Sequence, residues 1–155
     1  MKKMFLLMLI FIAASNSAKA QDKILYKDAV RCLNVELDGS ETLRITGFGR
    51  NRRDAKEQAM KNAVYVVLFE GVKDGNKGCN VRPIIENKIQ REKFSGFFDS
   101  FFKDKGEYKK YVNLKDTRFG SKNKNKTKIG AAYEMTVRVL RSELKTRMKE
   151  ENIIP

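Results

Sequence analysis

Residues 45–63 read ITGFGRNRRDAKEQAMKNA, and this stretch decides how the chain folds. It begins at the end of an alternating segment that is typical of a half-buried strand, with Leu43 and Ile45 on the buried face. Two glycines then allow a sharp turn, and Asn51 is a favoured helix cap with Asp54 three residues further on. Alanine recurs every four residues after that (Ala55, Ala59 and Ala63), which lets a helix lie close against a sheet. We therefore predict a strand that turns directly into a helix over about residues 52–71.

Alternation predicts further strands on both sides of this unit. Residues 29–37 alternate, with Leu33, Val35 and Leu37 expected to face the core, and Asp38-Gly39 is a hairpin signal before the strand at 42–47. Residues 111–119 and 131–140 alternate in the same way. The second of these segments is the clearest strand in the sequence.

Three helical segments are expected. The second opens at Pro83, a favoured first-turn residue, and continues through a phenylalanine-rich stretch with a break or bend near Gly96. The third begins at Ser142. The order strand, strand, helix, helix, strand, strand, helix predicts an α+β fold. We expect a single antiparallel sheet of about four strands, with the helices packed on one face.

The first twenty residues have the three-part layout of a secretory signal peptide. Lys2 and Lys3 precede an apolar run at residues 4–14, and Ala18-Lys19-Ala20 is a cleavage site. The run is too short to cross a bilayer. We therefore expect cleavage of residues 1–20, a single domain over residues 21–155, no transmembrane span after cleavage, and a periplasmic or extracellular location.

The chain has 33 basic and 19 acidic residues, a formal net charge of +14, and no histidine. Removal of residues 1–20 takes three lysines, which leaves a net charge of +11. Without histidine, His-based zinc sites and triads with a histidine base are excluded. The pattern Gly47-x-Gly49 is no dinucleotide fingerprint, because Arg52 stands where the third glycine would be. We expect no catalytic residue, no metal ligand and no cofactor.

Cys32 and Cys79 both follow the expected cleavage site. Export implies an oxidising compartment, where a disulfide between them would hold the Gly-, Asn- and Lys-rich segment at residues 73–80. Two unpaired thiols are the alternative, because spacing alone does not prove pairing.

Two local groups of basic residues are candidate anion-binding sites. One is Arg50, Arg52 and Arg53, at a helix start where free N–H groups favour anions. The other is a lysine-rich segment that is typical of a polar hairpin tip (Lys122, Lys124, Lys126 and Lys128). Anionic lipid head groups or lipopolysaccharide would suit both groups, and a solvated surface is the alternative. The absence of aromatic residues from the second group disfavours nucleic acid as a partner.

Five phenylalanines between residues 94 and 102 recur at helical spacing on one face. Such a face is usually core. Because so much apolar area lies in one segment, a partner or self-association surface is the alternative, formed by Phe97, Phe98, Phe101 and Phe102.

Residues 45–63 also resemble a pattern of bacterial envelope proteins in which a strand ends in G-x-G and a helix with alanine at every fourth position follows. The pattern is similar to that of the small Lpp-type envelope lipoproteins and of the N-terminal domain of the flagellar assembly protein T. The resemblance implies an α+β periplasmic domain that acts by binding, without catalysis. This chain departs from the family by lacking a lipidation cysteine and by its phenylalanine-rich segment.

Taken together, these patterns favour a non-catalytic binding or assembly module of the bacterial cell envelope, with an envelope protein as partner. One alternative is a binder of anionic envelope surfaces that uses the two basic groups. A second alternative is a hydrolase of an envelope polymer, which would need converging carboxylates that no spacing singles out.

Overall fold

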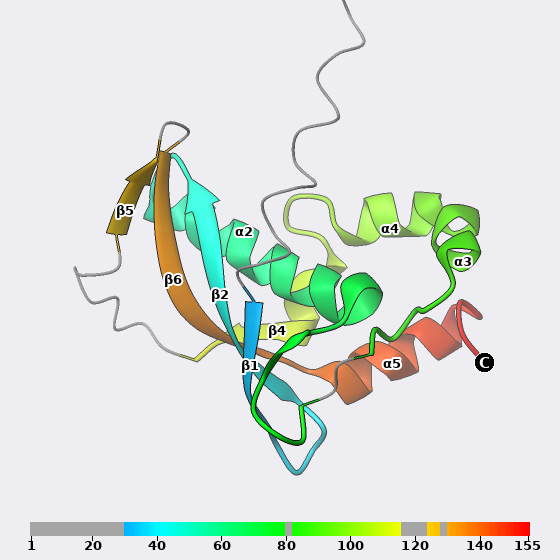
Figure 1. The fold of residues 1–155 in the computed structure, drawn as a ribbon. Helices are drawn as coiled ribbons and strands as arrows, with labels where there is room; N and C mark the ends of the chain where they lie inside the picture. The colour runs from blue at the N-terminus through cyan, green and yellow to red at the C-terminus, as the bar shows by residue number, and fades with distance from the viewer. Residues whose placement is uncertain (1–29, 80–81, 116–123, 128–129) are drawn as a thin grey trace, which may run out of the picture.

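The computed structural model describes residues 30–79, 82–115, 124–127 and 130–155. One mixed sheet has the strand order β3-β1-β2-β6-β4, and β5 pairs with β6 outside this path (Figure 1). The strands are β1 (Val30–Val35), β2 (Glu41–Gly49), β3 (Asp74–Gly75), β4 (Val112–Leu114), β5 (Lys124–Thr127) and β6 (Gly130–Val139). Every pairing is antiparallel except that of β3, which runs parallel to β1.

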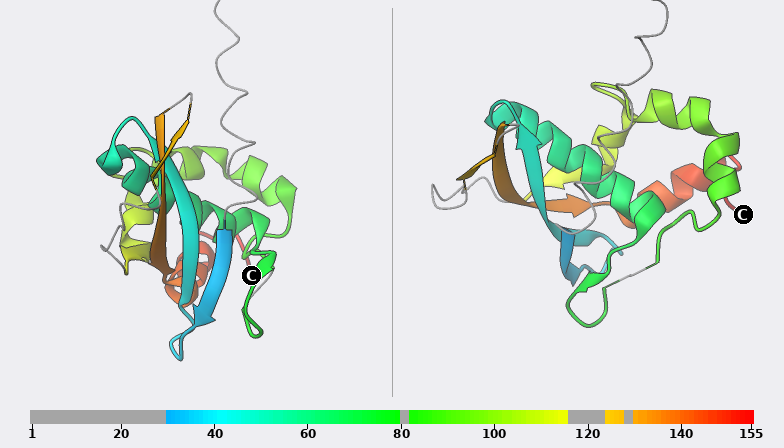
Figure 2. Two further views of the ribbon diagram at one scale, coloured as in Figure 1. Left: turned by 60° about the vertical axis from the view of Figure 1, so that its left-hand side comes forward. Right: turned by 45° about the horizontal axis from the view of Figure 1, so that its top comes forward.

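Helices lie on one side of this sheet and beyond its end (Figure 2). The helical elements are α2 (Arg52–Tyr65), the π-helical turn η1 (Val66–Glu70), α3 (Lys88–Lys93), α4 (Ser95–Phe101), the 3-10 turn η2 (Glu107–Tyr111) and α5 (Arg141–Glu150). The α+β class is confirmed. The expected purely antiparallel sheet of about four strands is correct only in part, because the short β3 and β5 join it and β3 makes it mixed.

The turn from β2 into α2 forms as the sequence predicts. Gly47 and Gly49 face the helix, and a Cβ built on Gly47 would lie 2.0 Å from the carbonyl oxygen of Ala55 and 2.9 Å from the Cβ of Ala59. Ala55, Ala59 and Ala63 are fully buried against the sheet. The two glycines and the alanine stripe therefore work together, because each removes the side-chain volume that would separate helix from sheet.

Gly47→Ala is expected to lower the free energy of unfolding by about 1–3 kcal/mol, because the added methyl group overpacks the helix–sheet contact. Gly96→Ala is the matched control, since nothing lies within 4 Å of a Cβ at Gly96. Urea denaturation of both variants measures their free energies of unfolding. Equal stability of the two variants would contradict the close packing of α2 on β2.

The buried face of β1 differs from the expectation. Val30 and Cys32 are buried and pair with Ile45 and Leu43, whereas Leu37 lies in the hairpin turn and is fully exposed. A shift of one residue exchanges the two faces of a strand. The ladder also shifts between Cys32 and Asn34, and after this irregularity Val35 packs against the core. Alternation predicted the strand correctly. The predicted inward face was right for Val35 and wrong for Leu33 and Leu37.

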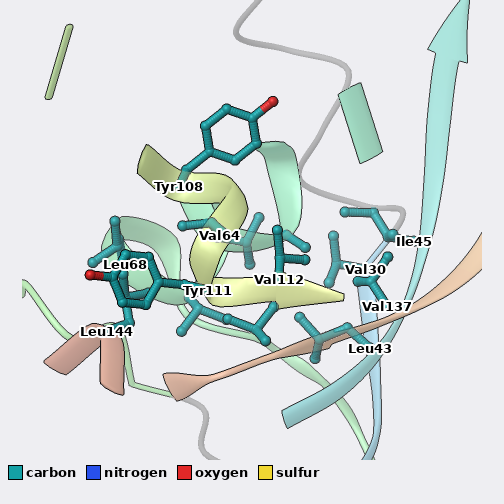
Figure 3. Packing of buried hydrophobic residues seen from close by; sticks show 14 of the residues in the cluster. Val30, Leu43, Ile45, Val64, Leu68, Tyr108, Tyr111, Val112, Val137 and Leu144 are labelled. Carbon is teal, nitrogen blue, oxygen red and sulfur yellow. The ribbon is translucent and has the colours of Figure 1, made fainter. Parts of the chain in front are cut away.

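The core lies between the sheet and the helical side of the molecule (Figure 3). Leu43, Ile45 and Val137 contribute from the sheet, and Val64 and Leu68 contribute from α2 and η1. Tyr108 of η2 is fully buried, and its hydroxyl donates a hydrogen bond to Glu57 at 3.4 Å. Burial, with the nearby Glu57 carboxylate, raises the pKa of Tyr108, so this hydroxyl stays protonated.

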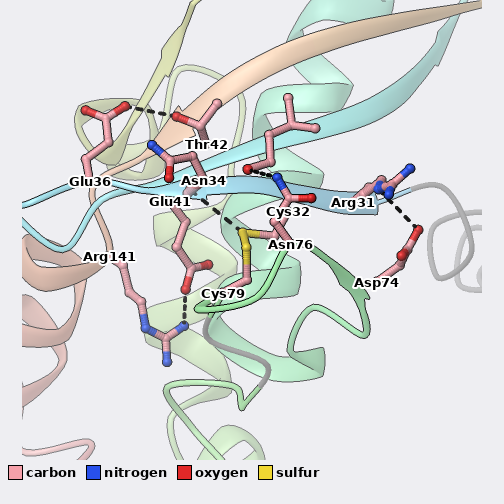
Figure 4. The surroundings of a disulfide bond; sticks show 11 residues. Arg31, Cys32, Asn34, Glu36, Glu41, Thr42, Asp74, Asn76, Cys79 and Arg141 are labelled. Carbon is pink, nitrogen blue, oxygen red and sulfur yellow. Dashed lines mark hydrogen bonds and ion pairs between the residues drawn. A yellow bond between two sulfur atoms is a disulfide. The ribbon is translucent and has the colours of Figure 1, made fainter.

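The disulfide between Cys32 and Cys79 is present and joins β1 to the loop after β3 (Figure 4). The Asn76 side chain adds to this attachment by donating a hydrogen bond to the carbonyl oxygen of Leu33 at 2.5 Å. The backbone N–H of Asn76 donates to the carbonyl oxygen of Cys32 at 3.1 Å. The alternative of two unpaired thiols is therefore excluded by the structure.

The segment around Pro83 is not the start of a helix. The N–H groups of Ile84 and Ile85 donate to the carbonyl oxygens of Val67 and Leu68 at 3.0 and 2.8 Å. These hydrogen bonds tie the segment to η1, so α3 begins later, at Lys88, where Asn87 caps it. The helical conformation is interrupted at Phe94, between α3 and α4, two residues before the position near Gly96 where a break or bend was expected.

Candidate anion-binding surface

The strand register brings the two predicted basic groups to the same end of the sheet. Gly49, next to Arg50, pairs with Ala131 of β6, and Ala131 pairs on its other side with Lys126 of β5. Two steps between neighbouring strands, about 10 Å, therefore separate the backbones of Gly49 and Lys126. Lys124 pairs further along β6 with Tyr133, which is also the partner of Gly47. Figure 2 shows β5 and the start of α2 at this shared end.

We call this region the basic end and define it as residues 50–56 together with β5. It contains six basic residues and a single carboxylate, Asp54; the basic residues are Arg50, Arg52, Arg53, Lys56, Lys124 and Lys126. Arg53 and Lys56 are exposed. Lys122 and Lys128, which belong to the predicted basic segment, lie outside the described residues. The predicted hairpin tip is in part a strand, since β5 lies within it.

The backbone at the start of α2 offers less to an anion than the sequence suggests. The Asn51 side-chain oxygen accepts hydrogen bonds from the N–H groups of Arg53 at 2.9 Å and Asp54 at 3.0 Å. Asp54 also places a negative charge in the first turn and forms an ion pair with Arg50 at 3.4 Å. The Asn51 side chain thus occupies two of the N–H groups that a helix N-terminus would otherwise offer to an anion. An anion would be held here by cationic side chains and not by the helix backbone.

Charges at the opposite end of the sheet are balanced. Around the β1–β2 hairpin, Glu36 pairs with Lys115 and with Arg138, and Asp38 pairs with Arg138. A hydrogen bond from Lys115 holds the pKa of Glu36 below its ordinary value, and the N–H of Ser40 does the same for the pKa of Asp38. Acids and bases compensate one another around this hairpin, whereas the basic end has six basic residues and one carboxylate.

Two further carboxylates, Glu57 and Glu107, also form ion pairs with basic residues. A hydrogen bond from Lys109 lowers the pKa of Glu57. Burial acts to raise the pKa of Glu107, but its hydrogen bonds with Arg147, at 3.2 and 3.4 Å, outweigh burial and hold that pKa below its ordinary value. A catalytic carboxylic acid needs the reverse shift, towards neutral pH. In the part of the chain that the structure describes, no group of three or more metal-ligating side chains could hold a metal ion.

The phenylalanine segment is largely core. Phe98 and Phe101 are buried, which corrects their candidate role in a partner surface, because buried rings offer little area to a second molecule. Phe97 and Phe102 are half-buried and pack against the same cluster. The ring of Phe102 stacks on Tyr108 with centroids 6.0 Å apart, and the guanidinium of Arg147 lies 5.7 Å from the Phe97 centroid. These rings are covered because η2 and α5 pack against α4 and the residue after it.

The sequence analysis missed two residues in this region, Lys56 in the basic end and Phe48 just before it. Lys56 follows Arg52 and Arg53 by one helical turn, and helical periodicity could have found it. Phe48, between the two glycines of the β2–α2 turn, was not predicted to have a role. Its position in the sequence could have indicated its orientation. A residue between two helix-facing glycines of a strand must point to the face away from the helix.

Comparison of the chain with protein-family models, curated proteins and solved structures gives no significant match. The resemblance to the Lpp-type lipoproteins and the flagellar assembly protein T therefore stays an expectation from residues 45–63. Among the helices that the structure describes, we find none that combines the length and the apolar character needed to cross a membrane.

Proposed function

We propose that this chain is an exported, non-catalytic binding module of the bacterial cell envelope and that it binds a polyanionic partner through the basic end. The observation that carries the proposal is the register of β2, β6 and β5, which places two basic groups about 70 residues apart in the sequence at one end of the sheet. Six basic residues and one carboxylate in these two segments attract anions and suit a partner with several phosphate groups.

The rest of the molecule supports binding over catalysis. The carboxylates with shifted pKa values (Glu36, Asp38, Glu57 and Glu107) all have lowered pKa values, owing chiefly to hydrogen bonds and basic neighbours. The disulfide supports the proposed export, because such bonds persist in oxidising compartments. The signal peptide proposed for residues 1–20 lies outside the described residues.

Inorganic polyphosphate is a suitable first probe, since it presents phosphate charges without any apolar group. The test variant changes Arg53, Lys56, Lys124 and Lys126 to serine, which leaves the Asn51 cap and the Arg50–Asp54 pair intact. Calorimetric titration should show affinity reduced roughly tenfold or more near 50 mM salt, because four phosphate contacts are lost. The slope of log affinity against log salt concentration should also fall by roughly three.

The matched control changes Lys88, Lys103, Lys145 and Lys149 to serine. These lysines are exposed, and they belong to α3, the segment after α4, and α5. The control removes the same net charge from elsewhere on the molecule, so its affinity should stay within about twofold of the unaltered chain if binding is local. Equal losses in the two variants would indicate a non-specific charge effect and would contradict the proposal, as would binding that is insensitive to salt.

A further inference from the structure

Three aromatic rings lie close together where the end of α2, the turn η1 and the end of α4 meet. The ring centroids of Tyr65 and Phe69 are 5.1 Å apart, and the centroid of Phe102 lies 6.0 Å from the first and 6.2 Å from the second. The ring planes are inclined to one another by 64°, 58° and 48°, so the rings form walls and not a stack. All three side chains are half-buried. We call these three residues the aromatic box.

The aromatic box already holds a cation. The guanidinium carbon of Arg91, a residue of α3, lies 4.9 Å from the centroid of Tyr65 and 4.6 Å from that of Phe69. A cation within about 6 Å of a ring centroid is attracted to the ring face, and a planar guanidinium stacks there better than an ammonium does. Within the part of the chain that the structure describes, Arg91 forms no ion pair with a carboxylate, so these two rings are its partners.

Little else holds α3 against the molecule. None of its residues is buried, and it lies at the outer margin of the fold (Figure 1). The side-chain oxygen of Gln90 is buried without a hydrogen-bond partner among the described residues, which opposes the docked position. The chain is fixed on both sides of the helix, because Ile85 and Phe98 are buried. The position of α3 between these fixed points therefore depends on Arg91.

We infer that the aromatic box is a binding site for an arginine side chain on a peptide segment of a partner protein, and that α3 closes this site by placing Arg91 in it. The inference does not depend on the basic end. The present occupant shows the chemistry that the box accepts, which is a guanidinium carried by a short peptide segment. A partner's arginine would make the same ring contacts after α3 has moved aside. Because Arg91 is tethered to the site, it competes at a high effective concentration.

A synthetic peptide with the sequence of residues 86–95 is a suitable probe, since it carries its arginine in the context that the box accepts. Arg91→Ala removes the competing cation and leaves the rings of Tyr65 and Phe69 in place. In an NMR titration with this peptide, the ring signals of these two residues should move to saturation. The dissociation constant for Arg91→Ala should be about tenfold or more below that for the unaltered chain, in which the open site is a minor state.

Lys93→Ala is the matched control, because it removes the same charge from the same helix. The ammonium of Lys93 lies 5.3 Å from the centroid of Phe94, outside the aromatic box, so this variant should bind the peptide as the unaltered chain does. The same peptide with the change Arg91→Lys should bind the Arg91→Ala protein roughly fivefold more weakly, since an ammonium does not stack as a plane.

Four results would overturn the inference. Equal dissociation constants for the Arg91→Ala and unaltered proteins would mean that α3 does not close the site, and equal binding of the two peptides would remove the preference for arginine. Free N-acetylarginine amide that binds as tightly as the peptide would contradict a peptide partner. Absence of peptide binding by Arg91→Ala, with amide signals outside α3 unmoved to show that the variant is folded, would exclude the site. Polyphosphate binding is measured separately, so each of these failures leaves the proposed function standing.

Discussion

Arg141→Met is expected to lower the free energy of unfolding by about 3–5 kcal/mol, the largest effect that we expect from a single substitution in this chain. Arg141 begins α5 and forms an ion pair with Glu41, with 3.5 Å between Nη1 and Oε1. Glu41 is fully buried at the start of β2. The same guanidinium donates a hydrogen bond from Nη2 to the carbonyl oxygen of Arg82 at 2.9 Å. Its removal would leave a buried carboxylate without this cation and would detach residue 82 from α5.

Chemical denaturation followed by circular dichroism measures the effect. Lys145→Met is the matched control, because Lys145 is an exposed residue of the same helix, and it should change stability by less than about 0.5 kcal/mol. The double variant Glu41→Gln with Arg141→Met should be more stable than Arg141→Met alone, since the buried charge is then absent. A loss of under about 1 kcal/mol for Arg141→Met would show that the buried carboxylate does not need its cation.

Replacement of both cysteines by alanine is expected to lower the free energy of unfolding by about 4 kcal/mol. The bond links residues 47 apart in the sequence, and on the chain-entropy model a loop of that length accounts for the size of the effect. Figure 4 shows the bond beside Asn76. Its loss would leave the loop after β3 held to β1 by the hydrogen bonds of Asn76, the short β3 pairing and the ion pair between Arg31 and Asp74.

Reduction provides the control for this prediction. A reducing agent should lower the melting temperature of the unaltered chain and leave that of the double alanine variant unchanged. If the variant melts at the same temperature as the oxidised chain, the bond adds nothing to stability and the prediction is wrong. Retention of polyphosphate binding by the variant is expected below its melting temperature. Cys32 pairs with Leu43 of β2, six residues before Gly49, so the disulfide lies away from the basic end.

Local patterns in the sequence were enough to predict the unit that organises the fold. The glycines at 47 and 49, the Asn51 cap and the alanines of α2 act over short distances, and each does in the structure what its pattern indicated. The inward face of β1 could not be obtained in this way. Leu33, Val35 and Leu37 looked like the buried set, but of these Val35 alone packs against the core, beside Val30 and Cys32. Pairing with β2 and the irregularity after Cys32 decide which face is buried.

The candidate site depends on long-range pairing. Arg53 and Lys126 each belong to a basic group that the sequence shows, but only the pairing of β2 and β5 with the two edges of β6 brings these groups to the same end of the sheet. The orientation of Phe48 likewise depends on packing, because Gly47 and Gly49 on either side of it approach the backbone of Ala55. Phe98 packs against Phe69 of η1 and Phe101 packs against Tyr111 of η2, and helical spacing alone cannot predict these contacts.

The location of the binding surface is tested most directly by two-dimensional NMR of the ¹⁵N-labelled chain during titration with polyphosphate. We predict that the amide signals that move will belong to residues 50–56 and 124–127, which form the basic end. Signals of the β1–β2 hairpin and of α5 should stay in place, because their charges are paired or lie at the other end of the sheet. Shifts concentrated in α3, α4 or α5, with the basic end unmoved, would contradict the assignment of the basic end as the binding surface.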